Sequence, residues 1–147
     1  MKAILLKLTT TTVNSDGIVT GFLHIADASA TLQRPYIYES LDELRADDRP
    51  ARVWRCLSSA QRLSNALAPG LYAMGMRWAR RTQNYKPSVI VPSEKGERVV
   101  MLRVKNTGRE EQPERGDLLL TEMFGRSVLR RIASTMRTGC EVYLRVE

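Results

Sequence analysis

The segment GLYAMGMRWARRTQNYKP, residues 70–87, indicates both how this chain folds and where its charge lies. In its first half, large side chains occupy every second position, at Tyr72, Met74, Met76 and Trp78. A period of two places alternate side chains on opposite faces of a β-strand, so we expect a strand whose large residues face the core. The second half is basic and polar, and it predicts the solvated end of that strand.

The residues that follow predict two more strands, and the whole of 71–105 is interpreted as a hairpin or meander with a basic rim. TQNYKPS has the composition of a turn. VIV, residues 89–91, is a short strand that Pro92 restricts to an edge or an end, because proline has no backbone N–H to donate. RVVMLRVK, residues 98–105, is the next strand.

Strands are also predicted at both ends of the chain. Residues 2–12 and 17–26 are rich in β-branched side chains, and Asp16-Gly17 between them is a hairpin turn signal, because glycine tolerates positive φ. The carboxyl end, CEVYLRVE, predicts a final strand with alternate apolar residues facing inward, namely Val142, Leu144 and Val146.

Helices are predicted in three places. Ser40 followed by Glu43 is a capping-box pattern for a short helix that ends before Pro50. The apolar spacing of residues 50–67 predicts a second helix, which Pro69-Gly70 stops. A third helix is expected over about 121–138, with an apolar stripe at every fourth residue formed by Phe124, Val128, Ile132 and Met136.

The order of these elements predicts the fold class. From residue 17 it is strand, helices, strand, strand, helix, strand, which is compatible with a ferredoxin-like β-α-β-β-α-β unit preceded by an extra hairpin strand. We therefore expect residues 1–147 to form a single α+β domain, a two-layer sandwich of an antiparallel sheet and two main helices. The charged loop 106–117, which contains proline and glycine, is predicted to be mobile.

The net charge of +7 is concentrated in the middle of the chain. Residues 49–109 contain 13 basic and two acidic side chains, whereas 1–48 and 110–147 each have a slight acidic excess. Eighteen of the 23 basic residues are arginine, whose planar fork matches phosphate and stacks on bases. A concentrated arginine-rich belt indicates an anionic partner.

The belt supplies the candidate binding residues. Phosphates require cations and unstacked bases require flat partners, and both kinds of side chain are interleaved here. The predicted nucleic-acid-binding residues are Arg52, Arg55, Arg62, Arg77, Trp78, Arg80, Arg81, Tyr85 and Lys86. A second set of arginines, Arg126, Arg130 and Arg131, could also follow phosphates. Charge on an exposed helix face usually reflects solvation, which is the alternative explanation of each helical stripe, and Trp78 could instead belong to the core.

The sequence contains little that indicates catalysis. It has no nucleophile elbow, no phosphate loop and no dinucleotide fingerprint. Its one histidine, His24, could act with a tyrosine in RNA cleavage, but we expect a structural or surface role. Cys56 and Cys140 lack metal-ligand spacing, so neither a metal nor a cofactor is expected.

These observations predict a non-enzymatic, cytoplasmic protein that binds RNA or single-stranded DNA. No run of 18 apolar residues indicates a membrane span. Two alternatives remain open. One is a small accessory or inhibitor protein of a phage or mobile element, which would use the belt against an acidic protein partner. The other is a subunit of a larger assembly.

Overall fold

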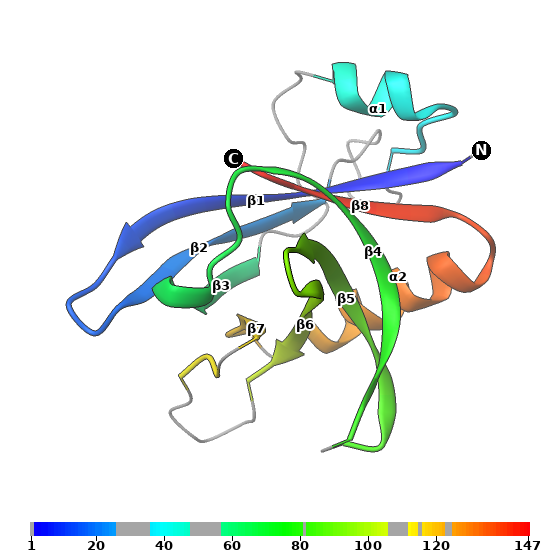
Figure 1. Ribbon diagram of the computed structural model, residues 1–147. Coiled ribbons are helices and arrows are strands. Elements are labelled where there is room, and N and C mark those ends of the chain that lie inside the picture. The colour runs from blue at the N-terminus through cyan, green and yellow to red at the C-terminus, as the bar shows by residue number, and fades with distance from the viewer. Residues whose placement is uncertain are drawn as a thin grey trace.

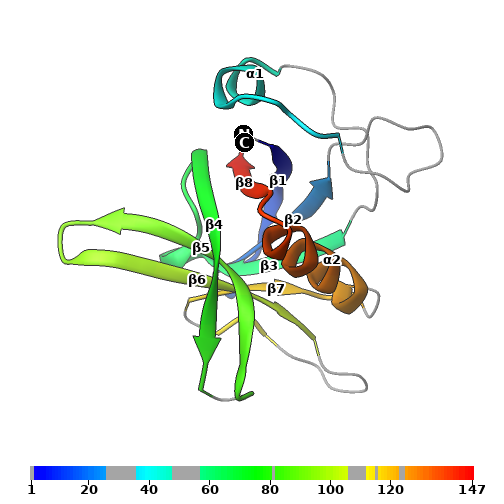
Figure 2. The same ribbon diagram turned by 90° about the vertical axis from the view of Figure 1, so that its right-hand side faces the viewer.

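A computed structural model of the chain describes residues 2–25, 36–47, 57–80, 82–105, 112–114, 116–122 and 125–147. Eight strands in these ranges close into one β-barrel, and a helix of 13 residues lies beside the barrel core (Figures 1 and 2). No helix in the described ranges is long and apolar enough to cross a membrane.

The elements follow one another along the chain in a strand-rich order. The strands are β1 (Ala3–Val13), β2 (Ile18–Ile25), β3 (Leu57–Arg62), β4 (Gly70–Ala79), β5 (Asn84–Ser93), β6 (Gly96–Val104), β7 (Asp117–Leu120) and β8 (Glu141–Val146). The helices are α1 (Leu41–Ala46), the single 3-10 turn η1 (Leu63–Asn65) and α2 (Gly125–Arg137).

Around the barrel the strand order is β1-β2-β3-β7-β6-β5-β4-β8, and β8 returns to β1. Six of the eight neighbouring pairs are antiparallel, and the pairs β1–β8 and β6–β7 are parallel. The β1–β8 ladder runs from Ala3 opposite Glu141 to Leu8 opposite Val146, so the two ends of the chain lie side by side.

The apolar run at the start of β1 is explained by burial on both of its faces. Ile4, Leu6 and Leu8 belong to the main core, whereas Ala3 and Leu5 face a second cluster that includes Tyr38 and Leu44 of the α1 region. A strand buried on both faces loses the alternation of apolar and polar residues.

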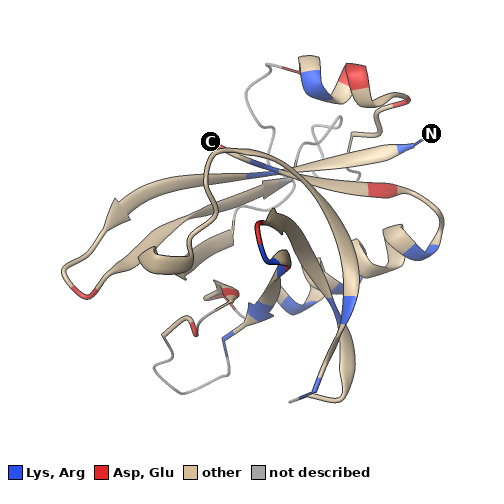
Figure 3. Ribbon diagram, viewed as in Figure 1, with Lys and Arg blue, Asp and Glu red and all other residues tan. Residues whose placement is uncertain are grey.

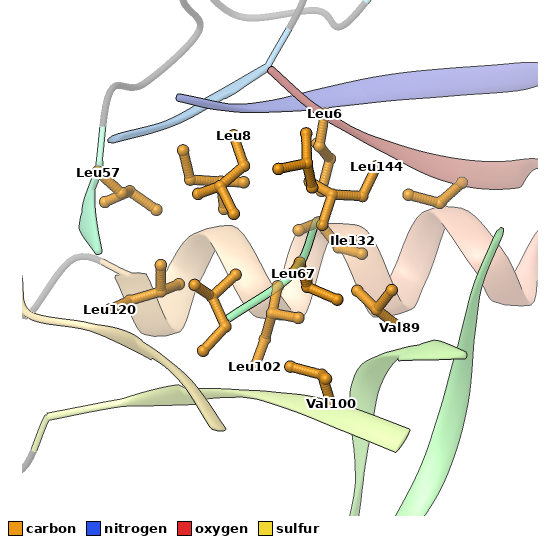
Figure 4. Packing of buried hydrophobic residues seen from close by; sticks show 14 of the residues in the cluster. Leu6, Leu8, Leu57, Leu67, Val89, Val100, Leu102, Leu120, Ile132 and Leu144 are labelled. Atoms are coloured by element: carbon orange, nitrogen blue, oxygen red, sulfur yellow. The ribbon is translucent and has the colours of Figure 1, made fainter. Parts of the chain in front are cut away.

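The main core lies between α2 and the inner faces of the strands (Figure 4). α2 contributes the buried residues Val128 and Ile132, which confirms the described part of its predicted apolar stripe. Opposite them lie Val89, Val100 and Leu102 of β5 and β6.

The predicted α+β, ferredoxin-like sandwich is wrong, because the chain forms a closed barrel of eight strands. Two segments that were not predicted as strands form strands, and a ferredoxin-like sheet has no place for them. With these strands added, every strand has two neighbours and the sheet has no free edge.

The first of these segments is 57–62, inside the predicted helix 50–67. It forms β3, which pairs with β2 from Ile18 opposite Arg62 to Leu23 opposite Leu57. Short apolar runs satisfy helical and extended spacing equally well, and sheet neighbours decide between them. The remainder of that predicted helix, up to residue 56, lies outside the described residues.

The second segment is 117–120, which forms β7 between β3 and β6, so α2 begins only at Gly125. The turn predicted at 82–88 is also shorter than expected, because β5 already begins at Asn84. The loop predicted at 106–117 lies mostly outside the described residues.

Several predicted elements are confirmed. The amino-terminal hairpin has nearly the predicted bounds, with Asn14 Oδ1 accepting the N–H groups of Asp16 and Ile18 in its turn. Ser40 caps α1, since its hydroxyl accepts the Glu43 N–H at 3.1 Å. The carboxyl-terminal strand also forms, and its alternate residues are buried as predicted.

Gly21 of β2 is a position where the barrel tolerates no side chain. A Cβ atom built there would lie 2.0 Å from the backbone oxygen of Thr9, next to an irregularity in the β1–β2 register. Because the obstructing atom is backbone, the strand itself would have to move.

We predict that Gly21→Ala lowers the free energy of unfolding by about 1–3 kcal/mol, the usual range for overpacking. Gly75→Ala is the matched control, because its Cβ would meet only Ile90 Cδ1 at 3.5 Å. Urea denaturation followed by circular dichroism measures both. Equal stability of the two variants would contradict the proposed close approach.

Arg145 of β8 attaches α1 to the barrel. Its guanidinium donates to the backbone oxygens of Asp47 at 2.7 Å, Leu44 at 2.8 Å and Arg45 at 3.2 Å. These carbonyls are at the end of α1, where the last turn of a helix leaves backbone oxygens that can accept further hydrogen bonds.

We predict that Arg145→Met lowers the unfolding free energy by about 1.5–3 kcal/mol, because charge-assisted hydrogen bonds are lost. Arg45→Met is the control, since the Arg45 side chain is exposed. Hydrogen exchange at Leu44 should accelerate in the first variant alone. Unchanged exchange there would show that α1 is held by other contacts.

Candidate anion-binding groove

A groove of about 590 Å³ lies between α2 and the strands β5 and β6. One wall is a face of α2, which carries Arg126, Arg130 and Arg137 and the apolar residues Leu129 and Ala133. The other wall comes from the sheet, and the turn between β4 and β5 contributes to one end. We call this site the arginine groove.

The helix wall follows from residue spacing. Arg126, Arg130 and Arg137 are four and seven residues apart, so they share one face of α2 over a rise of about 16 Å. Leu129 and Ala133, which also line the groove, lie between these arginines and the buried face of the helix.

The three groove arginines have no counterion among the described residues. Within the described part of the chain, no ion pair or hydrogen bond joins their side chains to a carboxylate. Arg126 is the second residue of α2, next to the positive end of the helix dipole, and the first turn contains no acidic residue to offset that end. A bound anion would offset the repulsion among the arginines and the repulsion between Arg126 and the dipole.

The sheet wall presents apolar and aromatic side chains beside two basic residues, Lys86 and Arg103. Pro87, Leu102 and Val104 line it, together with Tyr85 near the end of β5. Tyr85 is 61% exposed and packs edge-to-face against Trp78 of β4, with ring centroids 5.1 Å apart. Aromatic rings held in this way offer flat surfaces at little conformational cost.

Strand alternation divides the predicted belt between two faces. Trp78 pairs across the ladder with Tyr85, and Arg77 pairs with Lys86, so the aromatic pair and the basic pair lie on opposite faces of the hairpin. Lys86 nevertheless lines the arginine groove beside Tyr85, whereas Arg77 and Trp78 do not line it.

The outer face of the hairpin has acidic partners for its charges. Arg77 pairs with Glu97 at 3.3 Å, and Arg103, which borders the groove, pairs with Asp117 at 3.0 Å. Burial lowers the pKa of Lys86, the nearby charge of Arg103 lowers it further, and Asp117 partly opposes both.

The other predicted residues are scattered or not described. Arg62 is exposed at the end of β3, opposite Ile18, and does not line the groove. Arg80 is exposed in the turn after β4. Arg52, Arg55 and Arg81 lie outside the described residues.

The sequence contained a signal for the groove arginines. Arg126 and Arg130 border the apolar stripe of their helix one turn apart, and Arg137 continues the row. Their partner strands could not be read from the sequence, because β5 is some 40 residues away along the chain. Figure 3 shows the basic segments along α2 and on the β4–β5 hairpin.

The chemistry of the two walls suits an anion that carries a flat, partly apolar group. Guanidinium groups bind phosphate or carboxylate oxygens with two parallel hydrogen bonds. The opposite wall offers a ring face and aliphatic contacts. In the described residues, no group of three His, Cys, Asp or Glu side chains lies close enough to hold a metal ion.

His24 lies elsewhere, on β2. Its Nε2 is 3.3 Å from Thr9 Oγ1, its ring lies near that of Phe22, and its Nδ1 has no hydrogen-bond partner among the described residues. Burial lowers the pKa of His24, opposed in part by Glu147, while Lys7 lowers it further. The ring is therefore neutral at pH 7.

We predict that His24 makes the protein less stable in acid. Its folded pKa lies below 6.5, so the unfolded chain binds the proton first, and stability falls as the pH falls through that window. His24→Gln removes this component and leaves the carboxylates unchanged. Unfolding free energies at pH 8 and pH 5 should therefore differ less in the variant, and equal differences would exclude this role.

Comparisons of the chain with protein-family models, with curated proteins and with solved structures found no match. The candidate function therefore depends on the arginine groove and its surroundings alone.

Proposed function

We propose that this protein binds RNA or single-stranded DNA without catalysing a reaction, and that the arginine groove is its principal contact. The observation that carries the proposal is the pairing of two walls: three arginines that pair with no carboxylate in the described part of the chain face a sheet wall with an exposed tyrosine. Phosphates would contact the first wall, and an unpaired base would stack on the second.

Arginine is better suited than lysine to this role. Its fork makes two hydrogen bonds to one phosphate, and its charge persists at every physiological pH. The row on α2 follows the helix axis for about 16 Å, which is long enough to contact successive phosphates of a strand. Contacts to the backbone position a strand without selecting its sequence.

The aromatic wall favours single strands. In a duplex, both faces of each base are already stacked, so a protein ring gains little there. Tyr85 is exposed and is braced by Trp78, and Arg80 lies in the adjacent turn. Tyr85, Trp78 and Arg80 are all among the residues that the sequence predicts to bind nucleic acid. The groove adds the arginines of α2 to them.

We predict that binding of a fluorescein-labelled 12-nucleotide oligo(U) or oligo(dT) weakens with salt. Three phosphate contacts correspond to a slope of about −2 in log K against log salt concentration for a single strand. Fluorescence anisotropy at 50–200 mM salt (about a fourfold range) measures this slope.

We also predict that the double variant Arg130→Glu, Arg137→Glu loses most of this affinity and flattens the slope. Arg45→Glu with Lys95→Glu, an equal charge change at two exposed residues that do not line the groove, is the matched control. Circular dichroism checks that each variant is folded.

Binding that survives reversal of the groove charges would exclude the groove as the principal contact. A wild-type protein that binds neither strand even at about 50 mM salt, where screening is weaker than at physiological ionic strength, would refute the proposed function itself.

A further inference from the structure

The arginine groove combines walls that a phosphate backbone alone does not require. Neutralising phosphates requires only cations and hydrogen-bond donors, whereas the sheet wall here presents Tyr85, Pro87, Leu102 and Val104 beside Lys86 and Arg103. A ligand that fills the groove therefore presents negative charge to one side and a flat, weakly polar group to the other.

The size of the groove points to a compact ligand. Its volume of about 590 Å³ falls within the range of about 300–1,000 Å³ typical of pockets that enclose small molecules. A site that only followed a strand across an open surface would not need such a hollow.

The aromatic end of the groove is already organised. Trp78 holds the Tyr85 ring at an interplanar angle of 69°, and both side chains project from paired positions on β4 and β5. Stacking on this ring therefore requires little ordering of the protein. Thr82 and Asn84, which line the same end, place a hydroxyl and an amide near that position.

The anionic end is defined by α2. Arg126 and Arg130 are one turn apart, so two guanidinium groups can converge on one phosphate group, and Arg137 lies two turns further along. The described part of the chain offers these arginines no carboxylate that would compete with a ligand.

We propose that the arginine groove is a subsite for one nucleoside phosphate, with the base on Tyr85 and the phosphate on the arginines of α2. The ligand is either an unpaired residue within a strand or a free nucleotide. The first source rests on the proposed function, and the second does not.

The test is calorimetric titration with four probes at one low salt concentration: adenosine 5′-monophosphate, adenosine, inorganic phosphate and a hexanucleotide of adenosine. We expect the monophosphate to bind more tightly than adenosine or phosphate and to displace the hexanucleotide. Tyr85→Ala should weaken the monophosphate about tenfold and leave phosphate unchanged. Tyr85→Phe keeps the ring and should bind as the wild type does.

The outcomes separate the two proposals. If the hexanucleotide binds but the monophosphate neither binds nor competes, the subsite is refuted and the proposed function stands. If the monophosphate binds and the hexanucleotide binds no more tightly, the subsite stands and the strand-binding function is wrong. If no probe binds, both are wrong. A Tyr85→Ala variant that binds the monophosphate as well as the wild type would also refute the subsite.

Discussion

The parallel ladder between β1 and β8 closes the barrel, and the position of every other element depends on it. It joins residues 3–8 to residues 141–146, the largest sequence separation among the paired strands of the barrel. Parallel strands cannot be joined by a tight turn, so the chain between them must travel round the sheet. α2 is the last part of that path. It lies against β5, β6 and β8 and contributes side chains to the apolar core that the closed barrel surrounds.

The groove is a consequence of this arrangement. α2 buries one face and leaves an adjoining row of arginines beside the ends of β5 and β6. Closely spaced like charges repel one another, and in the described residues these three lack the acidic partners that Arg77 and Arg103 have. A rigid sheet opposite them holds an aromatic pair in place. The protein thus maintains an unfavourable charge distribution next to a preformed surface, which is the usual condition of an anion-binding site.

Local patterns were sufficient where the neighbours of a segment lie close in sequence. The hairpin at 3–25, the cap at Ser40 and the alternation in β4 all follow from residues within a few positions of one another. Patterns failed at β3 and β7, where short apolar runs fit either a helix or a strand. β3 is extended because it pairs with β2 and β7, and β7 because it pairs with β3 and β6. No pattern within either segment indicates which strands it pairs with.

The sequence alone determined the alternation of β4 and β8, the apolar stripe of α2 and the excess of arginine. Only the tertiary structure decided which of these residues share a surface. The basic belt that is continuous along the chain is divided, because Arg77 pairs with Glu97 away from the groove, whereas Lys86 lines it beside Tyr85. Tyr85 and Arg130 line one groove although they are 45 positions apart. The reason is physical: side-chain periodicity is a local property of the backbone, whereas the closure of a barrel depends on hydrogen bonds between its distant ends.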